Sequence, residues 1–142
     1  MKIFPFLLLI SFSCSHRSPY IYKSANHTEE NKYQIVDIND ILKNPRRYNE
    51  KNISVKGFFR YGFEMSAIFE SPRFTASTEG YDAIWLTCDS LSSDENESFL
   101  KLDKRMAIIK GKYSMGGKTG HLAAFIGEIK VDFLETNKGD YH

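Results

Sequence analysis

The sequence predicts a mainly β domain: five strands closed into a small barrel, with a short N-terminal helix and a second short helix between strands three and four. Apolar residues recur at period two over most of residues 52–135, interrupted by one segment with helical spacing. Glycines stand inside three of the strands, at Gly57, Gly111 and Gly127, where they permit the sharp coiling that closes a small barrel. A bent five-stranded Greek-key barrel with a helix in this position is an OB-fold.

A short helix opens the domain. Asp37 is of a residue type that caps helix N-termini, and the turn after it begins an apolar face. That face comprises Ile38, Ile41 and Leu42. Asn44 precedes Pro45, and the residue before a proline is displaced from the α region. The sequence therefore predicts a short helix that ends at Asn44 and leads into a loop.

Three strands are predicted next. In residues 52–64 one face is apolar, and the other is polar apart from Phe58. The apolar face comprises Ile53, Val55, Gly57, Phe59, Tyr61 and Phe63. A second strand follows at 66–71, and a loop containing Pro72 and Gly80 separates it from a nearly continuous apolar strand at 83–88.

The second half of the domain is predicted to contain a helix and two strands. Ser92 and Glu95 have the spacing of a capping box, which starts a helix over 93–102. A fourth strand covers 105–114, a glycine-rich turn covers 115–120, and a long last strand covers 121–135. Its inward face is expected to comprise Ala123, Phe125, Gly127, Ile129, Val131 and Phe133.

The stretch DINDILKNPRRYNEKNISVKGFF resembles a recurring opening of small exported bacterial OB-fold proteins. The matching residues are Asn44, Pro45, Tyr48, Lys51, Val55 and Gly57. Further along the chain, the resemblance is carried by Gly111, Gly120, His121, Gly127 and Ile129. It spans roughly residues 35–135 and implies the fold, but it implies no particular activity, because one fold hosts many functions.

The first fourteen residues, MKIFPFLLLISFSC, have the pattern of an export signal. Their apolar run is shorter than the roughly 20 residues that span a bilayer and has the length of a signal-peptide core. Ser11, Phe12, Ser13 and Cys14 resemble the lipobox of bacterial lipoproteins. This resemblance implies cleavage before Cys14, attachment of lipid to its sulfur, and a location at the cell envelope on a membrane facing the periplasm or the exterior. The alternatives are an ordinary signal peptide with an incidental Cys14, or a buried N-terminal strand.

The expected organisation is a signal peptide over 1–13, a flexible lipidated tether over 14–32, an OB-fold domain over 33–136 and a tail over 137–142. Lipid on Cys14 would leave Cys88 unpaired, as a small apolar residue in a strand. A Cys14–Cys88 disulfide is the competing interpretation if Cys14 carries no lipid.

Charge and motifs limit the function classes. Lys and Arg number 19 against 18 Asp and Glu, for a formal net charge of +1, which argues against strong nucleic-acid binding through many phosphate contacts. Metal-binding and catalytic motifs were not found, so no metal, cofactor or catalytic residue is predicted. Lys43, Arg46, Arg47 and Lys51 form a basic cluster, interpreted as a solvated face or as a contact for phosphate or anionic lipid.

Exposed aromatic residues of an OB-fold stack bases or sugars. The candidate ligand contacts are the aromatic residues Phe58, Trp85 and Tyr113, together with Arg60. Phe58 is the strongest of them because its neighbours on the same face of the strand are polar. The alternative is that Trp85 and most of the Phe residues belong to the core. The first hypothesis is a non-catalytic, lipid-anchored module that binds an envelope protein or polysaccharide. The second is a domain that binds single-stranded nucleic acid or oligosaccharide through aromatic stacking, and the third is an enzyme with an unfamiliar site.

Overall fold

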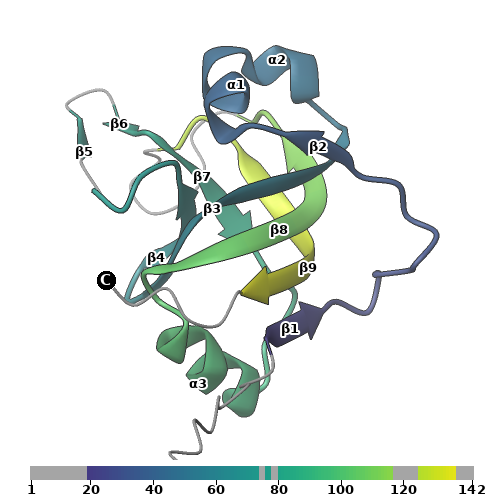
Figure 1. Cartoon of the computed structure of the whole chain (residues 1–142), viewed down its shortest axis with the longest axis vertical. Helices are drawn as coiled ribbons and strands as arrows, with labels where there is room; N and C mark the ends of the chain where they lie inside the picture. The colour runs from purple at the N-terminus through teal and green to yellow at the C-terminus, as the bar shows by residue number, and fades with distance from the viewer. Residues whose placement is uncertain (1–18, 74–75, 78–79, 117–124, 137–142) are drawn as a thin grey trace, which may run out of the picture.

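The computed structural model describes residues 19–73, 76–77, 80–116 and 125–136, and in this part of the chain five strands close a barrel (Figure 1). These strands are β3 (Asn52–Gly62), β4 (Met65–Phe69), β7 (Ala83–Thr87), β8 (Arg105–Ser114) and β9 (Glu128–Thr136). Hydrogen-bonded neighbours follow the ring β3, β4, β7, β9, β8 and back to β3, and only the β7–β9 pair is parallel. The predicted OB-like five-stranded barrel is confirmed.

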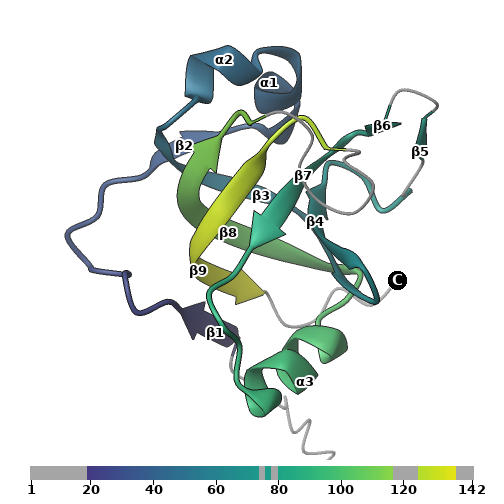
Figure 2. The ribbon, with the colours of Figure 1, turned by 180° about the vertical axis from the view of Figure 1, so that it is seen from behind.

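The remaining elements are short. They are β1 (Tyr20–Lys23), β2 (Gln34–Val36), α1 (Ile38–Lys43), α2 (Pro45–Tyr48), β5 (Ala76–Ser77), β6 (Gly80–Tyr81) and α3 (Ser93–Lys101). Both views of the ribbon place α1 and α2 at one end of the barrel and α3 at the opposite end (Figures 1 and 2). In the described part of the chain, no helix is long and apolar enough to cross a membrane.

The α1–α2 corner is held by one carboxylate. Asp40 accepts a hydrogen bond from the side-chain amide of Asn44 at 2.9 Å and another from the hydroxyl of Tyr48. The guanidinium of Arg47 lies 3.6 Å from the same carboxylate. The segment after Asn44 was expected to be a loop, but proline is well suited to a first helical turn, and α2 begins there. Asn44 and Tyr48, which carry part of the family resemblance, therefore have a structural role.

We expect Tyr48→Phe to lower the melting temperature at pH 7 by a few degrees. The Tyr48 hydrogen bond is the main cause that lowers the pKa of Asp40, so its contribution to stability is present above the unfolded pKa and is lost as pH falls through the folded value. The difference between the variant and the wild type should thus shrink toward pH 2, as measured by circular dichroism melts. An equal difference at both pH values would contradict this assignment.

Phe99 of α3 closes one end of the barrel. Its ring makes edge-on contacts with Tyr22 at 5.3 Å, Phe59 at 5.7 Å and Tyr61 at 5.3 Å between ring centroids. The helix itself begins as predicted, since the reciprocal hydrogen bonds of a capping box join Ser92 and Glu95. α3 therefore covers the apolar interior at this end of the barrel.

Some apolar residues do not face the side of the sheet that the sequence predicted. Phe63 was expected inside the barrel, but it lies in the β3–β4 turn and is 91% exposed. A register shift between Lys110 and Gly111 changes which residues of β9 face inward. Leu134 therefore joins the core cluster, whereas Phe133, which was expected inside, packs against the ring of His27.

Part of the tether predicted over 14–32 is a strand in the structure. Residues 20–23 form β1, which pairs antiparallel with β9, and Tyr22 is only 5% exposed within the core. Beyond β1, the backbone N–H of Ser24 donates to the carbonyl of Asp132 at 2.8 Å. The folded domain therefore includes β1, before the predicted boundary at residue 33, because an edge of β9 is available for pairing.

Several predictions fall partly or wholly outside the described residues. These are the signal peptide and Cys14, residues 117–120 of the turn, residues 121–124 of the last strand, His121 and the tail over 137–142. Within the described part, the last strand begins at Glu128.

Candidate functional site

A second apolar cluster lies on the outside of the barrel, over β3, β4 and β7. Phe59 and Ile68 belong to the interior core, so their chain neighbours Phe58 and Phe69 point outward. The buried members of the outer cluster are Ala67, Phe69, Ala83 and Phe125, and Phe58, Met65 and Trp85 pack against them half-buried.

A groove opens at the edge of this cluster. The β4–β7 ladder ends with the pair Ala67 and Trp85, and beyond it lies a hollow of about 370 Å³. Its lining includes Tyr61, Ser66, Trp85, Thr87, Cys88 and Asp89. The groove thus lies beside the second and third strands of the barrel, where its lining joins Trp85 of the outer cluster to Tyr61 and Leu86, which belong to or pack against the interior core.

The lining of the groove combines aromatic, aliphatic, hydroxyl and acidic side chains, including Leu86 and Leu91, and among the described residues it includes no lysine or arginine. The Tyr61 hydroxyl donates to the Asn96 side-chain oxygen at 2.5 Å, and Thr87 donates to Glu128 at 2.8 Å. Asp89 lies 3.4 Å from the ammonium of Lys130, at the margin of the groove. Such a surface suits a neutral ligand with hydroxyl groups and an apolar face.

The predicted ligand-binding residues divide into three cases. Phe58 and Trp85 share the outer cluster and keep part of their rings accessible, and the Trp85 ring lies 5.1 Å from that of Phe125. Arg60 shares the outer face of β3 but forms an ion pair with Asp103 at 2.9 Å. Tyr113 is 0% exposed inside the barrel, so its prediction as a ligand contact is wrong.

Sequence reasoning missed the other residues of the groove. Tyr61 packs against the interior core, as its predicted inward face indicates, and its position near the end of β3 also brings it to the lining. Thr87 and Asp89 stand at and just beyond the end of β7. The only signal for them was the polar sequence that follows the apolar run, which by itself does not reveal where the neighbouring strand stops pairing.

Cys88 follows β7 and is a free thiol. It is partly buried against the core, and this burial raises its pKa to about 12. The thiol therefore stays neutral at physiological pH and is a poor nucleophile.

We expect Cys88 in the folded protein to react with a disulfide reagent at pH 8 at least about a hundredfold more slowly than in the urea-unfolded protein. The rate should increase as pH is raised toward the elevated pKa. As a matched control, Thr87→Cys places a thiol on the adjacent, exposed residue and should react rapidly. Equal rates for the folded and unfolded states would show that burial does not suppress the thiolate.

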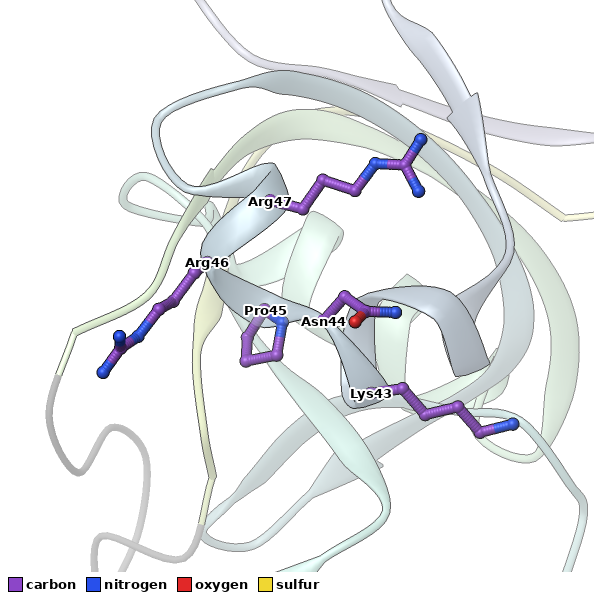
Figure 3. A pocket seen from close by; sticks show the side chains of 5 residues that line it. All are labelled: Lys43, Asn44, Pro45, Arg46 and Arg47. Atoms are coloured by element: carbon purple, nitrogen blue, oxygen red, sulfur yellow. The ribbon is translucent and has the colours of Figure 1, made fainter.

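The predicted basic cluster lies at the α1–α2 corner, where residues 43–47 line a hollow of about 460 Å³. The side chains of Lys43 and Arg47 extend to one side of the corner and that of Arg46 to the other (Figure 3). The Arg47 guanidinium also lies over the Tyr48 ring, 5.5 Å from its centroid. The three cations thus do not converge on one point, and the corner has the character of a solvated basic face.

Comparisons with known proteins add little beyond the fold. No protein-family model and no curated protein match the chain. One solved structure that it resembles is described as an aspartyl-tRNA synthetase from Leishmania major Friedlin, with 9% sequence identity and a TM-score of 0.44. The match covers 82% of this chain but only 23% of the synthetase chain. The ring of strands itself defines the class of protein: an OB-like barrel with a groove beyond the end of its β4–β7 ladder.

Proposed function

We propose that this protein is a non-catalytic OB-fold binding module, held at the bacterial cell envelope by lipid on Cys14. The observation that carries the binding function is the groove beside Trp85, beyond the end of the β4–β7 ladder. The lipid anchor is proposed from the N-terminal sequence, in which an apolar run and small residues lead to Cys14.

The composition of the groove favours an oligosaccharide as the ligand. A sugar ring offers an apolar face for Trp85 and hydroxyl groups for Ser66, Thr87 and Asp89. A nucleic acid would instead bring phosphates toward the Asp89 carboxylate without meeting any cation in the lining. We therefore propose a polysaccharide of the envelope as the partner and place single-stranded nucleic acid second.

Two features support a binding role over a catalytic one. Cys88, the strongest potential nucleophile of the groove, is kept neutral by its raised pKa of about 12. The carboxylate of Asp89 faces Lys130 at 3.4 Å and the amide of Asn26 at 3.4 Å, so it is held in polar contacts of its own.

The ligand class can be tested by titrating the purified protein with cell-wall oligosaccharides and, separately, with a single-stranded oligonucleotide at low salt. We expect saturable binding of the oligosaccharide, and Trp85→Ala should weaken it about tenfold or more, the usual effect of losing a stacked ring. Phe63→Ala removes an exposed ring outside the groove and should leave affinity unchanged. Salt-sensitive binding of the oligonucleotide alone would replace the polysaccharide assignment with the nucleic-acid one.

A further inference from the structure

We propose that the α3 end of the barrel rests on the membrane, with Phe63 and Leu100 in contact with the interface of the bilayer. This inference rests on the proposed lipid anchor at Cys14 and adds the orientation of the domain and the surface that contacts lipid. Three observations support it: where the exposed apolar residues are, how β3 joins α3, and how short the chain is between Cys14 and β1.

Three large apolar side chains that face solvent, Ile21, Phe63 and Leu100, belong to elements at or near this end, whereas Ile35 precedes α1 at the other end (Figure 1). Among the described residues, those that are at least two-fifths exposed are Ile21, Ile35, Phe63, Leu100 and Ile126. Phe63 is 91% exposed in the β3–β4 turn, and Leu100 is 50% exposed in the last turn of α3. Ile21 belongs to β1, which also lies near α3 (Figures 1 and 2).

The β3–α3 junction brings Phe63 and Leu100 to the same edge. The hydroxyl of Tyr61 donates to Asn96 of α3 at 2.5 Å, and the backbone N–H of Tyr61 donates to Asp103 at 2.9 Å. Leu100 lies one helical turn after Asn96, on the same side of α3. Phe63 follows Tyr61 by two residues, and the β3–β4 turn lies beside the C-terminal end of α3 in both views (Figures 1 and 2).

The chain between Cys14 and the first strand is short. β1 begins at Tyr20, whose ring lies 6.2 Å from that of Phe99 in α3. The six residues from Cys14 to Tyr20 span at most about 20 Å when fully extended. A lipid on Cys14 therefore keeps the α3 end close to the headgroups, while the α1–α2 corner lies at the far end of the barrel (Figure 1).

Phe63 and Leu100 are better suited to contact lipid than the basic α1–α2 corner is. Aromatic and aliphatic side chains next to lysines are typical of surfaces that lie in the membrane interface. The exposed Lys101 and Lys104 lie beside Leu100 at the C-terminal end of α3, whereas the carboxylates of Asp94 and Glu95 lie in its first turn. The opposite orientation, with Lys43 and Arg46 on anionic headgroups, would require the tether to reach past the whole barrel.

Spin labelling of the acylated full-length protein in vesicles of phosphatidylethanolamine and phosphatidylglycerol tests the orientation. One label is placed by Phe63→Cys and a matched one by Ile35→Cys, which is also apolar and is 87% exposed but precedes α1. The raised pKa of Cys88 and the lipid on Cys14 leave the introduced thiol as the preferred site. We expect the ratio of collisions with oxygen to collisions with an aqueous nickel chelate to be several-fold higher for the Phe63→Cys label.

The other outcomes overturn the proposal in distinguishable ways. Intact masses of the same samples report whether Cys14 is acylated; a mass without lipid removes the anchor and with it this orientation. An acylated protein whose two labels are equally accessible to the chelate retains the anchor but rejects the membrane contact. A lipid-exposed label at residue 35 supports the basic corner instead, and a label at residue 63 shielded from both reagents indicates a protein partner or a second copy.

Discussion

Replacing Gly111 with alanine should lower the free energy of unfolding by about 3 kcal/mol or more, the upper range for overpacking a filled interior. A Cβ atom at this position would overlap the carbonyl oxygen of Lys130 on the neighbouring strand and would come within 2.8 Å of Ile129. A backbone atom cannot move aside without opening the β8–β9 ladder. This ladder contains the register shift next to Gly111, so the substitution should disturb the place where the barrel bends.

The matched control is Gly62→Ala in β3. A Cβ atom there would meet nothing within 4 Å, so we expect a change within about 0.5 kcal/mol. Gly57→Ala provides a second test, since its Cβ atom would lie 2.6 Å from the carbonyl oxygen of Phe69, and it should also destabilise. Urea titrations followed by circular dichroism give the three values; a Gly111→Ala protein as stable as Gly62→Ala would mean that β8 and β9 do not approach this closely.

Phe99→Ala should cost about 3–5 kcal/mol, as expected for removing a buried aromatic ring. The ring is 0% exposed and is surrounded by the rings of Tyr20, Tyr22, Phe59 and Tyr61. Its loss would leave a cavity where α3 meets the barrel and would weaken the attachment of β1. Since total stabilities of domains are about 5–15 kcal/mol, the variant should be close to unfolding at 37 °C.

Leu100→Ala is the control for Phe99→Ala, because it removes an apolar side chain from the adjacent residue of the same helix, where Leu100 is 50% exposed. We expect a change of only about 0.5 kcal/mol. Both variants are compared by urea denaturation with a common slope. Similar losses of unfolding free energy for the two variants would contradict the assignment of Phe99 as the residue with which α3 closes the barrel.

Elements with strong local signals were predictable from the sequence. β8 occupies the residues 105–114 that its alternation predicted, and the Ser92 capping box starts α3 at the expected residue. In both, the deciding interactions lie within a few residues of each other. A barrel of five strands was also predictable, because the succession of strand and helix signals and the glycines inside the strands match the pattern of an OB-fold.

Features that depend on distant partners were not predictable. β1 is a strand because β9 offers it an edge, and β2 pairs in parallel with β3 over three residues. The inversion at Phe133 results from an extra residue in β9, Asp132, which is skipped where β9 pairs with Lys110 and Gly111 of β8. The composition of residues 14–32 resembles that of a linker and carries no sign of this pairing.

The candidate site was predictable in part. The period-two pattern placed Phe58 on the outer face of β3, where it is half-buried beside the outer cluster. It did not show that Tyr113 fills the interior, since alternation alone does not state which side of a strand is covered. The groove itself exists because the β4–β7 ladder stops at Trp85, which is a tertiary property.

The proposal that lipid on Cys14 anchors this protein is tested most directly by the intact mass of the protein expressed in a bacterium and extracted from its membranes, beside a Cys14→Ala variant. We expect the wild-type chain to begin at Cys14 and to carry the added mass of acyl chains, and the variant to lack that mass and to leave the membrane fraction after processing. A wild-type protein without added mass, recovered in the soluble fraction, would contradict the anchor.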